Sequence, residues 1–145
     1  MIKKFEHFTG MRNISYSGII LNNKSKNKLL NIINNIFSIP EDWSIYAHHM
    51  TICLGELPTI YRDYREEEIE LIVTHYGLND KSLAVKVDGF FTLSRCKDEI
   101  NNRIPHITIS TSPGTSPKES NNIKNWIKIK PFKIKGKIME IHNIE

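Results

Sequence analysis

Two alternating apolar runs decide the fold that this sequence predicts, Ile45-Tyr-Ala-His-His-Met-Thr-Ile-Cys-Leu54 and Ile104-Pro-His-Ile-Thr-Ile-Ser110. In an extended strand, side chains two positions apart point to the same face. His49 and Thr51 therefore share one face of the first strand, and His106 and Thr108 share one face of the second. The apolar residues between them point to the opposite, buried face. We expect the two strands to face each other, so that two imidazoles and two hydroxyls converge on one phosphate.

A third His-x-Thr match, His7-Phe-Thr9, lies near the N-terminal end of the chain. Gly10 follows it, where the other two matches continue into an apolar strand. Because the strand context is missing, we expect no catalytic role for His7.

The composition predicts one soluble globular domain over residues 1–145, since 39% of the residues are hydrophobic, 25% are charged and no linker interrupts the chain. No apolar stretch approaches the roughly 20 residues of a membrane span, and the N-terminus lacks the apolar core of a signal peptide. We therefore expect a cytoplasmic monomer without a membrane partner. In that reducing compartment Cys53 and Cys96 are expected to be free thiols.

The net charge of +4 suits an anionic substrate. Stable binding of duplex DNA is not expected, because it usually requires denser, arginine-rich patches. No glycine-rich phosphate loop occurs, which disfavours a nucleotide-dependent kinase or ligase.

Hydrophobic periodicity predicts a mainly antiparallel α+β fold. Ser116-Pro117-Lys118-Glu119 is a typical helix start, with a capping serine, proline at the first position and glutamate at the third. The expected strands are 14–21, 44–54, 69–76, 82–87, 103–111 and 132–141, and the expected helices are 25–37 and 117–126.

Two histidines can cleave a phosphodiester without a metal or another cofactor. One neutral imidazole removes a proton from the attacking oxygen, and one protonated imidazole donates to the departing oxygen, which predicts a bell-shaped pH–rate profile. Hydroxyl donors stabilise the developing phosphoryl charge. A zinc site is disfavoured because His48 and His49 are adjacent, and strand alternation sends them to opposite faces. We expect His48 to be a core or interface residue.

At these positions the chain resembles the two-histidine (2H, LigT-like) phosphoesterase superfamily, through His49-Met-Thr51-Ile and His106-Ile-Thr108-Ile. The segments 46–55, 83–89 and 120–126 look like its "Swiss Army Knife" RNA repair-like branch. The resemblance implies a bilobal fold, in which two mainly antiparallel sheets with flanking helices surround a central cleft.

The resemblance also implies that His49 and His106 are the acid–base pair and that Thr51 and Thr108 bind the phosphate, with no metal. Its members act on ribose 2′-linked or 2′,3′-cyclic phosphates of RNA ends, on 2′,5′-oligoadenylates or on cyclic oligonucleotides. RNA repair and degradation of a cyclic dinucleotide immune signal, as by a host-defence antagonist, both stay open, as does a non-catalytic module that binds nucleotides or RNA ends. For base stacking the first candidate is Tyr16, followed by the aromatic residues Phe90, Phe91 and Trp126.

Overall fold

The computed structural model describes residues 14–89 and 104–142. The sequence-based expectations for His7, Phe90, Phe91 and Cys96 lie outside these residues. The described elements are β1 (Ile14–Leu21), α2 (Asn23–Ile36), β2 (Ser44–Ile45), β3 (His49–Leu54), the 3₁₀ helix η1 (Thr59–Tyr64), β4 (Glu68–Leu78), β5 (Ser82–Gly89), β6 (His106–Thr111), the 3₁₀ helix η2 (Pro117–Asn122) and β7 (Trp126–His142).

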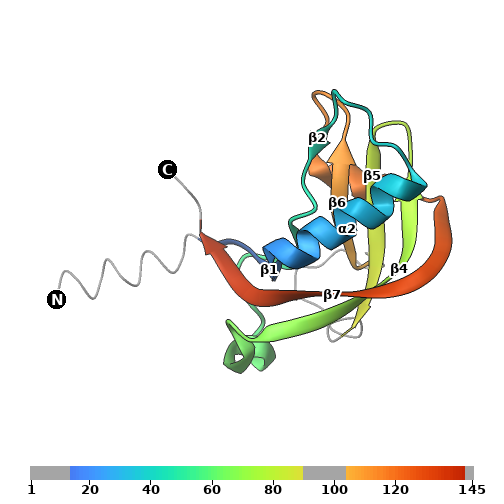
Figure 1. Cartoon of the computed structure of the whole chain (residues 1–145). Helices are drawn as coiled ribbons and strands as arrows, with labels where there is room; N and C mark the ends of the chain where they lie inside the picture. Colours follow the sequence, from blue (N-terminus) through green and yellow to red (C-terminus); the bar gives the residue numbers. More distant parts are fainter. Residues whose placement is uncertain (1–13, 90–103, 143–145) are drawn as a thin grey trace.

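Six antiparallel strands close into a barrel in the order β6-β3-β1-β7-β4-β5, and β5 returns to pair with β6. The short β2 is an additional strand on β6. The expected bilobal α+β fold, with two sheets around a central cleft, is therefore wrong, since the described residues form one closed and mostly β structure. Figure 1 shows the single curved sheet, with α2 lying across it.

The length of β7 is the reason that two separate lobes do not form. This strand has 17 residues, and it pairs with β1 through residues 136–142 and with β4 through residues 126–137. A single strand thus joins the two halves of the chain into one sheet, as its long red arrow shows in Figure 1. The sequence predicted only its second half, residues 132–141.

The predicted helix 117–126 is also wrong beyond Asn122. Its start is confirmed, because Ser116 Oγ accepts a hydrogen bond from the Lys118 backbone N–H at 3.2 Å. The helix is a 3₁₀ turn that ends at Asn122, and the chain is extended again from Trp126, which pairs with Gly77 of β4. Pairing with the sheet overrides the local helical preference.

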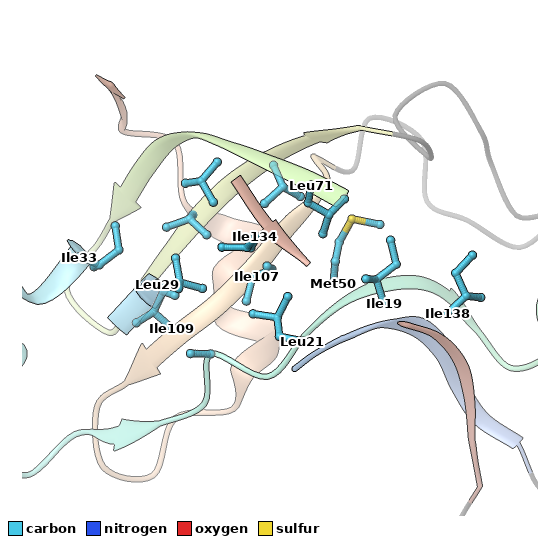
Figure 2. Close-up of a cluster of buried hydrophobic side chains, with 14 of the residues drawn as sticks. Ile19, Leu21, Leu29, Ile33, Met50, Leu71, Ile107, Ile109, Ile134 and Ile138 are labelled. Atoms are coloured by element: carbon cyan, nitrogen blue, oxygen red, sulfur yellow. The ribbon is translucent and has the colours of Figure 1, made fainter. Parts of the chain in front are cut away.

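The interior of the barrel is filled by one apolar cluster (Figure 2). Ile19, Met50 and Ile107 lie side by side on β1, β3 and β6, and all three are at most 4% exposed. Leu29 and Ile33 of α2 belong to the same cluster. Burying each such side chain contributes about 1.5–3 kcal/mol, which fixes both the strand register and the face that each strand turns outward. Among the described residues, no helix is long and apolar enough to cross a membrane.

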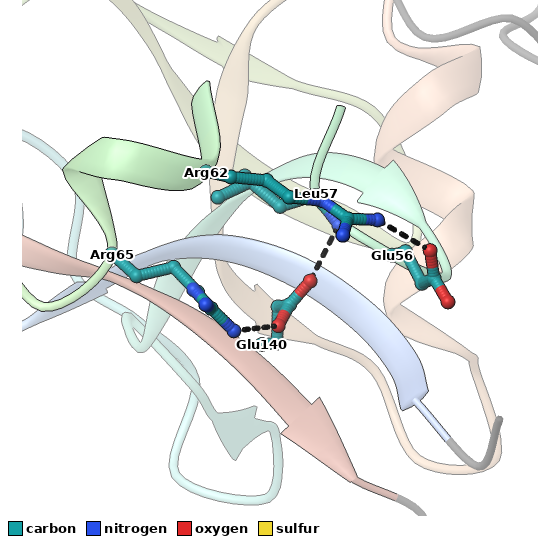
Figure 3. A network of polar contacts seen from close by, with 5 residues as sticks. All are labelled: Glu56, Leu57, Arg62, Arg65 and Glu140. Atoms are coloured by element: carbon teal, nitrogen blue, oxygen red, sulfur yellow. Dashed lines mark hydrogen bonds and ion pairs between the residues drawn. The ribbon is translucent and has the colours of Figure 1, made fainter. Parts of the chain in front are cut away.

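The chain after β3 is tied to β7 by the Glu140 carboxylate (Figure 3). One carboxylate oxygen accepts the Leu57 backbone N–H at 2.9 Å, and the other lies 3.2 Å from the Arg65 guanidinium. The Glu140 side chain is only 11% exposed, whereas that of Arg65 is 52% exposed. It anchors the segment that follows the strand carrying the first His-x-Thr motif.

Candidate functional site

The two His-x-Thr motifs lie on neighbouring strands, joined at the pair Met50 and Ile107. Because β3 and β6 are antiparallel, this pairing places His49 opposite Thr108 and Thr51 opposite His106. Met50 and Ile107 point into the core, so the four motif side chains point outward. The prediction that the motif side chains share one face is thus confirmed, but this face is the outer surface of the barrel and not a cleft between lobes.

His49 is half-buried among three side chains. The Tyr16 ring stacks on its imidazole, with 4.5 Å between ring centroids and 26° between planes. Burial lowers the pKa of His49, and together with electrostatic repulsion from the neighbouring His48 and His106 it brings that pKa to about 4. The imidazole is therefore neutral at pH 7, with a lone pair available as a base.

His48 contacts His49 directly, because their Nδ1 atoms lie 3.0 Å apart. The expectations of a core residue and of a side chain pointing to the opposite face are wrong, since the His48 side chain is exposed and turns toward its neighbour. Strand alternation does not apply to this pair, because β3 begins only at His49 and Ala47 has a left-handed φ of 47°. If His49 Nδ1 donates the shared proton to His48, then Nε2 of His49 carries the lone pair.

His106 is held by a different hydrogen bond. Its Nδ1 lies 2.7 Å from the backbone carbonyl oxygen of Ile104, which only accepts, so Nδ1 must carry a proton. The second ring nitrogen, Nε2, can then donate or accept according to protonation. In both motif histidines, the same nitrogen is engaged by the protein.

The two threonine hydroxyls differ in what they contact. Thr51 forms no hydrogen bond through its side chain within the described part of the chain, so its hydroxyl can donate to a ligand. Thr108 Oγ1 lies 2.8 Å from the hydroxyl of the buried Ser120 and 3.3 Å from the Pro117 carbonyl oxygen. If Ser120 donates to Thr108, the Thr108 hydroxyl can donate its own proton either to the Pro117 carbonyl oxygen through the long bond or to a phosphoryl oxygen of a ligand.

Tyr16, predicted as a base-stacking platform, lies in the site but faces His49. One face of its ring is covered by that imidazole. Tyr16 therefore supports the histidine, and only its other face is left for a base.

Sequence reasoning missed His48, Ser120 and Lys86. The alternation within 82–87 is consistent with an outward Lys86, but only the strand pairing shows that it lies opposite His106. Its ammonium lies 5.5 Å above the centroid of the Trp126 ring, a cation–π distance. The backbone of Lys86 thus pairs with the second motif histidine, while its ammonium is directed at the Trp126 ring.

Among the described residues, no group of three or more His, Cys, Asp or Glu side chains could hold a metal ion. Cys53, two positions after Thr51, is buried and disulfide-bonded, which corrects the expectation of a free thiol.

No known protein family and no curated protein matches this chain. The function is therefore inferred from the geometry of the two motifs.

Proposed function

We propose that the chain is a metal-independent phosphodiesterase that cleaves ribose 2′-linked or 2′,3′-cyclic phosphodiesters by acid–base catalysis with two histidines. The observation that carries the proposal is the Met50–Ile107 strand pair, which gathers two imidazoles and two hydroxyls on one face. A purely structural role does not account for two half-buried histidines placed diagonally on an outer surface.

The geometry favours His49 as the general base. Its lowered pKa keeps it neutral at pH 7, and when its Nδ1 donates to His48, its Nε2 is the proton acceptor. It would remove the proton from the attacking hydroxyl or water oxygen as that oxygen bonds to phosphorus.

His106 is then the general acid. Its Nδ1 proton is held by the Ile104 carbonyl, and its Nε2 would give a proton to the departing oxygen. The negative charge of the bound phosphate stabilises the protonated ring. Thr51 and Lys86 would stabilise charge on the non-bridging oxygens, because each offers a donor that no described side chain accepts.

The test is turnover by the EDTA-treated full chain on a panel of defined substrates. The panel contains 2′,3′-cyclic nucleotides, 2′,5′-oligoadenylate, and 2′,3′- and 3′,3′-cyclic dinucleotides. The His49→Ala/His106→Ala double variant runs beside the wild type. Turnover of any member that is lost in the variant supports the proposal and identifies the substrate class, and turnover of a cyclic dinucleotide identifies a signal-degrading enzyme. Binding without turnover of any member contradicts it and favours a nucleotide-binding module.

A further inference from the structure

Four side chains with basic nitrogens lie in register across four neighbouring strands. They are His106 on β6, Lys86 on β5, His75 on β4 and Lys128 on β7, and the Cα pairs are Lys86–His106, His75–Lys86 and His75–Lys128. We call these four residues the basic row. It begins at the second motif histidine and leads away from it around the barrel.

The basic row lies on the outer surface of the barrel. Val85 and Ile107, the neighbours of Lys86 and His106 along their strands, are both fully buried, so Lys86 and His106 point the other way. The Lys128 side chain is exposed, and His75 is half-buried. The Trp126 indole lies over Gly77, where an added Cβ would come within 2.4 Å of the ring. The Lys86 ammonium above that indole is therefore held by a fixed aromatic face.

No carboxylate of the described residues neutralises Lys86 or Lys128. By contrast, Lys133, further along β7, lies 3.7 Å from the Glu70 carboxylate. Asp88, two residues after Lys86, accepts a hydrogen bond from the Gly89 N–H at 2.9 Å and forms no ion pair with the row.

The pKa of His75 responds to the excess positive charge in the row. Its pKa is lowered by burial and, in addition, by the charges of Lys86 and Lys128. A bound anion would relieve this repulsion.

We propose that the basic row binds consecutive phosphates of a linear single-stranded oligonucleotide, whose scissile phosphate lies between His49 and His106. The position of the scissile bond rests on the function proposed above, whereas binding along the row needs no turnover. Neighbouring strands are about 4.8 Å apart, so Lys128 lies about 14 Å from β6 along the sheet. One phosphate cannot contact both ends of the row. A cyclic mononucleotide would contact only the end of the row at the second motif histidine.

Binding is measured by fluorescence anisotropy with the wild-type full chain and fluorescein-labelled 2′-O-methyl oligouridylates, a dimer and a pentamer. These probes lack the 2′-hydroxyl nucleophile, so turnover does not disturb the measurement. Lys86→Gln and Lys128→Gln are compared with Lys133→Gln, which removes the same charge from β7 at a lysine that Glu70 already pairs. Circular dichroism confirms that each variant is folded.

We expect the pentamer to bind at least about 10-fold more tightly than the dimer. Lys86→Gln and Lys128→Gln should each reduce the slope of log Kd against log salt by about one, the value for one lost phosphate contact. Lys133→Gln should leave the slope unchanged. Equal affinity for dimer and pentamer, or equal slopes in all three variants, would overturn the proposal. Pentamer binding with the expected slopes in a protein that turns over no substrate would support the basic row and refute the phosphodiesterase.

Discussion

His48 and His49, consecutive in the chain, place their Nδ1 atoms 3.0 Å apart, and their rings meet edge to face with centroids 5.2 Å apart. Only one proton fits between two nitrogens at this distance, so the contact couples the tautomers of both rings. The Tyr16 ring stacked on His49 restricts the same imidazole from a second side. His49 is therefore positioned by its neighbours before any substrate arrives.

Replacing His48 by alanine should reduce kcat by about 10-fold, the free energy of roughly one hydrogen bond, because His49 loses the partner of its Nδ1. His48→Asn should recover most of the activity, since the asparagine side-chain oxygen can take the place of the imidazole Nδ1. Long-range ¹⁵N–¹H correlation spectra should show a single His49 tautomer in the wild type and in His48→Asn, and mixed tautomers in His48→Ala. A His49 spectrum that does not change in His48→Ala would show that the contact does not set the tautomer.

Stability should fall on acidification between about pH 6.5 and pH 4. The pKa of His49 is lowered to about 4 in the folded chain, so in this window the unfolded chain binds more protons and the free energy of unfolding decreases as the pH falls. The loss attributable to His49 is about 3 kcal/mol once the pH is below 4. Urea unfolding at several pH values measures it.

His49→Gln is the matched comparison for the pH dependence. His48 and His75 also have lowered pKa values, and they contribute slopes of the same sign in both proteins. The difference between the wild type and His49→Gln therefore reports the titration of His49 together with its contact with His48. Parallel curves for the two proteins would mean that His49 titrates as an exposed histidine does.

Alanine at His49 or at His106 should reduce turnover by roughly 10²–10⁴-fold, the usual contribution of one general acid or base. The double variant should be little worse than either single variant, because the two groups act in one step. Near-ultraviolet circular dichroism should be retained in all three, since both side chains point away from the core. Full activity in either single variant would remove that histidine from the mechanism.

Valine at Thr108 should lower stability, whereas valine at Thr51 should lower activity with little effect on stability. Thr108→Val deprives the buried Ser120 hydroxyl of its partner, so we expect a loss of about 1–3 kcal/mol in the free energy of unfolding. Thr51→Val should change stability by less than about 0.5 kcal/mol and still lower kcat, because its hydroxyl has no hydrogen bond within residues 14–89 and 104–142. Denaturant unfolding and steady-state kinetics check both. A Thr51→Val protein with normal kcat would contradict the phosphate-binding role.

Gly18→Ala should destabilise the barrel where β1 meets the first motif strand. A Cβ on Gly18 would lie 2.6 Å from the Met50 carbonyl oxygen, which belongs to the backbone and cannot rotate away. We expect a loss of about 1–3 kcal/mol, measured as a lowered midpoint of thermal unfolding. An unchanged midpoint would show that the two strands can separate there without cost.

Several features of this protein were predictable from local sequence. Alternation in 49–54 and 106–111 predicted which side chains share a face, because the period of two is a property of any strand whose apolar residues are buried. The strand 14–21 and the helix Asn23–Ile36 followed from the same kind of pattern, and Ser116 predicted the start of η2. The charged segment 61–68 gave no clear signal, and it holds the end of η1 and the chain leading into β4.

The sequence by itself determined that each histidine shares a face with a threonine, since that depends only on neighbours two positions away. The tertiary structure decided everything that depends on which strands pair. Pairing at Met50 and Ile107 brought the motifs together, pairing of Lys86 with His106 placed a lysine on the strand position opposite the second motif histidine, and the long β7 closed one barrel where two lobes were expected. The left-handed turn at Ala47 brought His48 onto His49. These contacts join segments far apart in the chain or reverse its local direction, and no local pattern records either.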